Sequence, residues 1–118
     1  MKTPYRLERA PQANSDIRSV LRFLIQSHVR FGASFAEAKE RAGAKLREIR
    51  AAMNHLAVLA HQGTRHLELI PGLRSVTKDR VIFYFIVDDE ARIVRVLAVF
   101  FGGQDHQRAM LKRLGSGR

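Results

Sequence analysis

The segment that decides the fold is Arg80–Phe101, RVIFYFIVDDEARIVRVLAVFF. Two runs of β-branched and aromatic residues, Arg80–Val87 and Arg92–Phe101, lie on either side of the polar residues Asp88–Ala91. This pattern is typical of two strands joined by a short turn. Both runs are apolar at odd and even positions alike, so we expect central strands or strands whose second face is covered.

Shorter extended segments are predicted around this hairpin. Leu73–Thr77 is a candidate strand and Lys78-Asp79 a candidate turn, so three consecutive strands form an antiparallel meander. Near the N-terminus, Tyr5–Arg9 alternates apolar and polar residues, as a half-buried strand does. A further short extended segment is expected at His66–Ile70.

The apolar period changes to three and four residues between these strands. It predicts an amphipathic helix over about residues 12–30 and a second over about residues 34–61. Ser34 followed by Glu37 forms a capping box at the start of the second helix, and Gly63 is the expected stop signal. The core stripe expected of the second helix includes Leu46, Ile49, Met53 and Leu56.

The C-terminal segment Asp105–Leu114 predicts a short helix with Asp105 as its N-cap. A helix of this length is marginal unless it docks on the rest of the domain. Phe100 and Phe101 precede it and must point to opposite faces of their strand, so one of them needs cover from this helix or from a partner.

The predicted order is therefore β-α-α-β-β-β, with a possible short C-terminal helix. This is an α+β fold in which a helical hairpin packs on one face of an antiparallel sheet. The 118 residues, of which 46% are hydrophobic, are enough for one domain over residues 1–118, with residues 115–118 as a flexible tail.

The chain is strongly basic, with 21 Lys and Arg against 11 Asp and Glu and a formal net charge of +10. A field of this sign attracts polyanions, which leaves nucleic acid and an acidic protein as possible partners. On the meander, several cations lie near an aromatic residue. Such a group can bind nucleic acid, with the cations holding phosphates and the ring stacking on a base, or it can bind an acidic peptide. The cations can also serve only to protect a strand edge from pairing with other chains. The residues concerned are Arg74, Lys78, Arg80, Arg92 and Arg95, with Tyr84 among them.

Several functional classes are disfavoured. The sequence has no Cys, so we expect no disulfide and no thiolate chemistry, which is compatible with a cytoplasmic location. No run of about 18 apolar residues predicts a membrane span, and MKTPYRLERA does not read as a signal peptide. His61 and His66 are five residues apart, a spacing that does not suit a metal, so both are expected on the surface. Asp88–Glu90 is typical of a solvated turn, so neither a metal nor a cofactor is expected.

Three motifs in order resemble the ParE branch of the RelE/ParE toxin superfamily, the plasmid stabilization toxins. They are PGLRS at Pro71–Ser75, IFYFIVDD at Ile82–Asp89 and IVRVLAVFFGGQD at Ile93–Asp105. The resemblance implies the toxin of a type II toxin–antitoxin pair. RelE-like members cut mRNA on the ribosome and ParE-like members poison DNA gyrase. Both are neutralised by a cognate antitoxin with a partly disordered, often acidic segment.

The sequence departs from the family at the end of the last strand. Phe101 and Gln104 stand where ParE relatives tend to have His and Arg. Cutting RNA needs a general base and cations that stabilise the developing charge on phosphorus. Because the end of the last strand lacks such a base and such cations, we expect a ParE-like inhibitor of DNA gyrase. The alternative is a RelE-like, ribosome-dependent mRNA endoribonuclease, with Arg80, Tyr84 and His106 as its weak catalytic candidates.

Two sets of basic residues are the predicted contact sites. The last helix would present its cations to the target on one exposed face, with His106 incidental. The antitoxin's acidic side chains would meet cations of the first helix and of the sheet. The target-binding candidates are Arg108, Lys112 and Arg113, and the antitoxin-binding candidates are Arg18, Arg22, Arg74 and Arg95.

Overall fold

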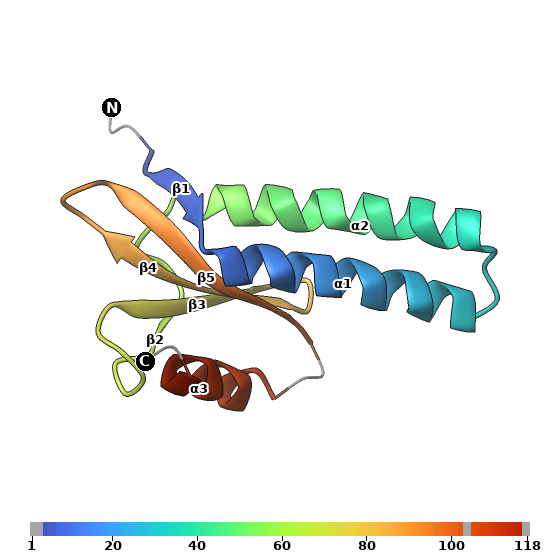
Figure 1. Cartoon of the computed structure of the whole chain (residues 1–118). Helices are drawn as coiled ribbons and strands as arrows, with labels where there is room; N and C mark the ends of the chain where they lie inside the picture. The colour runs from blue at the N-terminus through green and yellow to red at the C-terminus, as the bar shows by residue number, and fades with distance from the viewer. Residues whose placement is uncertain (1–3, 103–104, 117–118) are drawn as a thin grey trace.

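A computed structural model describes residues 4–102 and 105–116, so Gly103, Gln104 and the chain ends lie outside the described residues. Within them, five strands form one sheet in the order β1-β5-β4-β3-β2. Two long helices cover one face of this sheet, and a third helix covers the other face (Figure 1). The elements are β1 Arg6–Arg9, α1 Pro11–Arg30, α2 Phe35–His55, β2 Thr64–Arg65, β3 Leu73–Lys78, β4 Val81–Asp88, β5 Ile93–Phe101 and α3 His106–Ser116.

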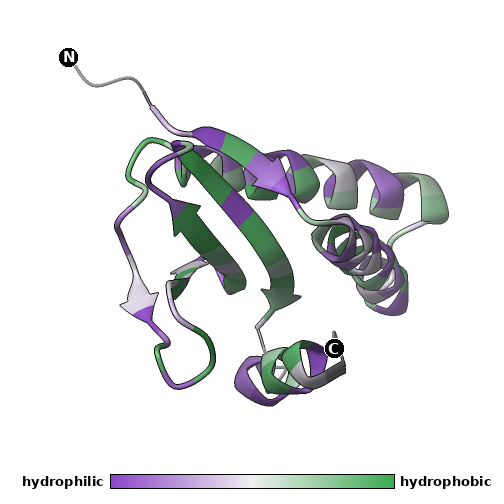
Figure 2. Ribbon diagram, turned by 60° about the vertical axis from the view of Figure 1, so that its left-hand side comes forward, coloured by the Kyte–Doolittle hydropathy of each residue, from purple (hydrophilic) through white to green (hydrophobic). Residues whose placement is uncertain are grey.

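The central hairpin, β4 and β5, is buried on both faces, as its sequence predicts. Alternate residues of a strand point to opposite faces. Val81, Phe83 and Phe85 therefore lie in the core beneath α1 and α2. Ile82 and Tyr84 belong to a second core on the α3 side. Figure 2 shows these two strands as the most hydrophobic part of the chain.

The helical hairpin is confirmed. The predicted capping box is present at the start of α2, where the Ser34 side chain accepts from the Glu37 backbone and the Glu37 side chain accepts from the Ser34 backbone. Ile49 and Met53 are buried in the core that contains the odd-numbered residues of β4. Leu46 packs against the same core but is only partly buried.

Three details of the prediction are wrong. α2 ends at His55, and residues 56–61 form turns, because the chain must bend there to reach the sheet. Gly63 is not the helix stop: it lies at φ +84° against the Ser75 carbonyl, where a Cβ atom has no room. The segment His66–Ile70 is not extended, and the strand that pairs with β3 is Thr64–Arg65 instead.

The sheet and the C-terminus add two further corrections. β1 pairs with β5 in parallel, whereas all the other pairings are antiparallel. α3 continues to Ser116, so the first two residues of the expected tail, Gly115 and Ser116, are helical. No helix of the described residues combines the length and the apolar composition that crossing a membrane requires.

The core assignment predicts that Ile49→Asp unfolds the domain. Ile49 is 3% exposed, and an unpaired charge at such a position costs several kcal/mol. The neighbouring exposed Arg50 provides the control, because Arg50→Asp changes the surface of the same helix. Urea unfolding followed by circular dichroism checks both variants, and a cooperative, near-native Ile49→Asp transition would contradict the assignment.

Candidate functional site

The third helix, α3, is built as the sequence predicts. The Asp105 side chain accepts from the Arg108 backbone N–H at 3.2 Å, and its carbonyl accepts from Ala109 at 3.0 Å. Met110 is 1% exposed and belongs to the second core with Phe100. The helix is therefore docked on the sheet, which answers the question of how so short a helix is held.

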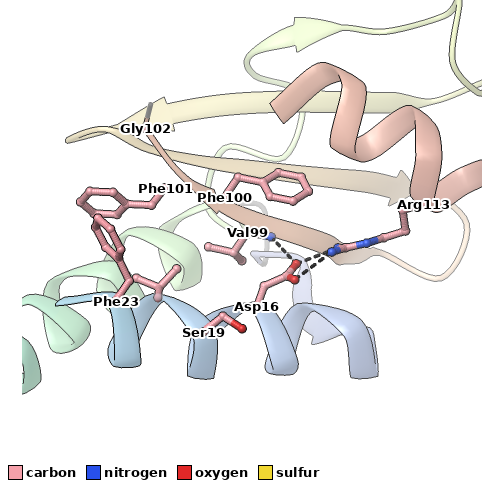
Figure 3. Close-up of a pocket in the computed structure, with 9 residues that line it drawn as sticks. Asp16, Ser19, Phe23, Val99, Phe100, Phe101, Gly102 and Arg113 are labelled. Atoms are coloured by element: carbon pink, nitrogen blue, oxygen red, sulfur yellow. Dashed lines mark hydrogen bonds and ion pairs between the residues drawn. The ribbon is translucent and has the colours of Figure 1, made fainter. Parts of the chain in front are cut away.

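An ion pair fastens α3 to α1 (Figure 3). The Arg113 guanidinium donates to both carboxylate oxygens of Asp16, at 2.7 and 2.9 Å. One of these oxygens also accepts from the backbone N–H of Val99, at 2.9 Å. The guanidinium lies 5.1 Å from the ring centroid of Phe100. Asp16 thereby connects α1, β5 and α3.

This ion pair contradicts the expectation that Arg113 lies on the exposed basic face of α3. Arg113 is directed inward, with only 25% of its side chain exposed, because its charge is needed to neutralise Asp16. Arg108 and Lys112, one helical turn apart, are both exposed. Arg108 also pairs with Asp105 at 3.4 Å. The exposed basic face of α3 is therefore smaller than expected.

A groove of about 510 Å³ lies beside the ion pair, between α1 and the end of β5. Its apolar lining includes Phe23 and Phe101, whose ring centroids are 5.5 Å apart. Phe23 is 51% exposed. Figure 3 shows Phe101 and Phe100 on opposite sides of β5, as predicted, with Phe100 toward α3.

The α3 face of the sheet carries a polar cluster around Tyr84, which is fully buried. The Tyr84 hydroxyl hydrogen-bonds Nδ1 of His106 at 2.8 Å. Burial raises the pKa of Tyr84, and the carboxylates of Glu68 and Asp105 raise it further. His106 is therefore not incidental to the structure, because it satisfies a buried hydroxyl.

His66 is the functional-type residue that sequence reasoning placed wrongly. It was expected on the surface, but it is 6% exposed, and its ring lies beside the Tyr84 ring with centroids 5.3 Å apart and an angle of 48° between the ring planes. Its Nε2 lies 2.7 Å from Ser75 Oγ, and its Nδ1 lies 3.4 Å from a Glu68 oxygen. No local pattern could have revealed this, since β3 supplies the hydroxyl that holds the ring.

The three nuclease candidates do not converge. Tyr84 and His106 meet under α3, but Arg80 lies in the turn before β4, at φ +70°. The Arg80 guanidinium is 5.8 Å from the ring centroid of Phe101, whose side chain packs against the core on the α1 and α2 side. The Arg80 guanidinium therefore points away from the face of the sheet that holds Tyr84 and His106.

The antitoxin candidates of α1 lie together. Arg18 and Arg22 are exposed one turn apart and donate to Ser15 and Ser19, at 3.0 and 3.2 Å. These contacts are short-range and leave both guanidinium groups at the surface. The arrangement offers a pair of cations along the α1 face that borders the groove.

The antitoxin candidates of the sheet lie apart from those of α1. Arg95 pairs with Glu8 at 2.8 Å and so connects β5 to β1. Arg74, on β3, is partly buried and lies 3.5 Å from the Gln62 carbonyl. The four predicted residues therefore do not form one site.

A second polar cluster holds the start of the N-terminal strand, and no pattern in the sequence predicts it. Asp89, in the turn after β4, accepts from the Tyr5 hydroxyl at 2.6 Å and from His61 Nε2 at 2.7 Å. The hydrogen bond from Tyr5 is the main reason that the pKa of Asp89 is lowered. Within the part of the chain that the structure describes, no group of three or more possible ligands is arranged to hold a metal ion.

Because Arg113 neutralises Asp16, we expect Arg113→Ala to lower the stability of the domain. The change leaves a nearly buried carboxylate without its cation, which costs about 3 kcal/mol of the free energy of unfolding. Arg108→Ala is the matched control, since that side chain is 85% exposed and its pair with Asp105 is worth less than about 1 kcal/mol. Urea titration of both variants checks the difference, and equal losses would contradict the role of the pair.

The Tyr5–Asp89 contact predicts a pH dependence. A carboxylate whose folded pKa is lowered stabilises the protein above its ordinary value of about 3.9, and the contribution is lost as pH falls through the folded pKa. Tyr5→Phe removes the main donor, so the stability of this variant should fall less steeply between about pH 5 and pH 2. Unfolding free energies measured across that range test this, and parallel curves would refute it.

Comparisons with known proteins place the architecture. No protein-family model matches the sequence, and no curated protein is significantly similar to it. The fold matches a chain of the chromosomal ParDE toxin–antitoxin system from P. aeruginosa, with a TM-score of 0.61 and 18% identity over 83% of this chain and 96% of that one.

Two further solved structures have the same arrangement. The toxin–antitoxin complex RelBE2 from Mycobacterium tuberculosis gives a TM-score of 0.57 at 14% identity, covering 84% of this chain and 99% of that one. A mutant E. coli RelE toxin in the free state gives 0.51 at 14% identity, covering 94% and 97%. The resemblance seen in the sequence is thus confirmed at the level of architecture: the chain has the fold of the RelE/ParE toxins.

Proposed function

We propose that this chain is the toxin of a type II toxin–antitoxin pair and that it acts by binding DNA gyrase, without cutting RNA. The main support for gyrase binding over RNA cleavage is that the candidate nuclease residues are buried or lie apart from one another. Tyr84 is fully buried and hydrogen-bonded to His106 beneath α3. Arg80, the cation that would stabilise a developing phosphate charge, leans toward the opposite face of the sheet.

The surface charge supports a macromolecular target. The net charge of +10 steers the chain toward acidic partners at a rate that depends on ionic strength. On α3, Arg108 and Lys112 lie on the exposed side, opposite the buried Met110. We infer that these two residues contact the target and that Arg113 acts indirectly, by holding α3 in place.

One observation favours the alternative, a ribosome-dependent mRNA endoribonuclease. Two imidazoles flank the Tyr84 ring, with His66 at 5.3 Å and His106 at 5.9 Å between ring centroids. Imidazole side chains are common general acids and bases in enzymes. Movement of α3 would be required before RNA could reach them, which is why this function takes second place.

A cognate antitoxin follows from the proposal. Arg18 and Arg22 on α1 are suited to an acidic segment, because both are exposed. The salt dependence of the on-rate would report their contribution, since charges at the surface are screened over about 8–10 Å at physiological ionic strength.

The proposal is tested with the purified full chain in two assays, supercoiling by bacterial DNA gyrase and cleavage of mRNA on programmed ribosomes. We expect inhibition of supercoiling and no mRNA cleavage. The double reversal Arg108→Glu with Lys112→Glu should weaken inhibition. Its control, Arg47→Glu with Arg50→Glu, makes the same change in charge on α2 and should not.

The variant His106→Asn separates the two functions. Asn retains an acceptor for the Tyr84 hydroxyl but cannot exchange a proton near neutral pH. Gyrase inhibition should therefore survive the change. Ribosome-dependent cleavage by the wild-type chain that is lost in His106→Asn would replace the proposal with the endoribonuclease.

A further inference from the structure

A second cavity, of about 450 Å³, lies near the start of β5, at the opposite end of this strand from the groove beside Asp16. Three segments of the chain line it: residues 4–5 before β1, residues 58–62 after α2, and Arg92 between β4 and β5. The Tyr5 N–H donates to the Ala57 carbonyl at 3.0 Å, and the Tyr5 hydroxyl donates to Asp89 at 2.6 Å. These hydrogen bonds hold the segments together, and the volume of the cavity suits a small molecule.

Part of the cavity lining is apolar. Val58 and Leu59 follow each other in the turns after α2, and they are 56% and 57% exposed. Large aliphatic side chains gain stability when apolar groups remove them from water. Two such neighbours in the lining of one cavity therefore favour a ligand with an apolar part.

The lining also contains a hydrogen-bond donor without a partner. The side-chain Nε2 of Gln62 is buried, and no group of the described residues accepts from it. A buried donor that makes no hydrogen bond is costly, so native proteins rarely leave one unpaired. A ligand that brings an oxygen acceptor to Gln62 would remove this cost. A water molecule can do the same, but it would leave Val58 and Leu59 uncovered.

The other polar groups of the lining favour an anion. The Arg92 guanidinium lies 4.8 Å from the centroid of the Tyr5 ring. His61 Nε2 lies 2.7 Å from Asp89 Oδ1, and this contact orients the imidazole. Asp89 itself is outside the lining, and the same oxygen accepts from the Tyr5 hydroxyl. Among the described residues the lining therefore holds no carboxylate, and its formal charge is that of Arg92.

The backbone of Arg92 gives further support to a binding role. Its φ of +56° lies in the left-handed region, which residues other than glycine rarely adopt. Conformations of this kind are concentrated at active sites and at residues that hold ligands. The cation of the lining thus lies at a position where Gly or Asn would be less strained.

We infer that this cavity binds a small organic acid that has an apolar body. The carboxylate of the ligand lies at Arg92, His61 and the Gln62 amide, and its apolar body covers Val58 and Leu59. This site goes beyond the proposed function, because none of the residues assigned to the target, to the antitoxin or to RNA cleavage lies in its lining. The bound ligand joins the start of β1 to the turns after α2 and to the turn before β5.

Other occupants match fewer of these groups. Inorganic phosphate suits Arg92 and His61 but leaves Val58 and Leu59 exposed. A neutral apolar molecule covers these two side chains but makes no use of the positive charge. An acid with an apolar body matches both parts of the lining, as ligands of mostly apolar pockets with a few polar groups do.

The probe that tests the inference is 2-naphthoate, an apolar ring system that carries one carboxylate. We expect it to bind the full chain with a Kd of about 1 mM or lower, as typical ligand efficiency predicts for its size. In NMR spectra the largest chemical-shift changes are expected at residues 58–62 and at Arg92. The neutral 2-naphthamide and the small acid acetate each lack one of the two recognised features, so both should bind about tenfold more weakly or worse.

Two pairs of variants test the lining. Leu59→Ser should raise the Kd of 2-naphthoate by about fivefold or more, because it removes apolar contact. Leu111→Ser is the matched control, since that α3 side chain is 58% exposed and lies outside the cavity. Gln62→Leu removes the unpaired donor, so it should preserve the stability of the domain but raise the Kd by about tenfold. Its control is Gln26→Leu, at an exposed position of α1.

Saturable binding with shifts at the cavity and the expected losses would support the site. Absence of saturable binding, or shifts centred on another surface such as the groove beside Phe23, would overturn it. Equal binding of 2-naphthamide, displacement by an equal concentration of inorganic phosphate, or an unchanged affinity of Gln62→Leu would also overturn it. These measurements involve neither supercoiling nor mRNA cleavage, so the failure of the site is distinguishable from the failure of the proposed function.

Discussion

The arrangement of α1 and α3 about the end of the sheet depends on the contacts of the Asp16 carboxylate. This carboxylate lies on α1, accepts a backbone N–H of β5 and pairs with Arg113 of α3. A carboxylate so little exposed is stable only when its charge is neutralised and its oxygens are hydrogen-bonded. These requirements fix where α1 crosses the sheet edge and how α3 lies on the opposite face. The groove beside Phe101 follows from that geometry.

Much of the fold could be predicted from local patterns. The two apolar runs of Arg80–Phe101 identify β4 and β5, and Ser34 with Glu37 marks the start of α2. Phe100 and Phe101 point to opposite faces because the period of a strand is two. The end of α2 at His55 was missed, since the contact just beyond it is long-range: the Ala57 carbonyl accepts from the Tyr5 N–H at 3.0 Å.

The site was harder to predict for a physical reason. Asp16 and Arg113 are 97 residues apart in the sequence. The buried ring of His66 is hydrogen-bonded to a hydroxyl of β3, that of Ser75. A basic residue in an amphipathic helix reads as a surface cation unless its buried partner is known. The prediction therefore placed Arg108 and Lys112 correctly at the surface and Arg113 incorrectly beside them.

Amide hydrogen exchange in Asp16→Asn tests the central role of Asp16 most directly. The Asn side-chain oxygen can still accept from the Val99 N–H, but it carries no charge for Arg113. We expect Val99 to keep its protection while the amides of α3 exchange about tenfold faster or more, because α3 opens separately from the rest of the domain. Exchange of the α3 amides at wild-type rates would contradict the account.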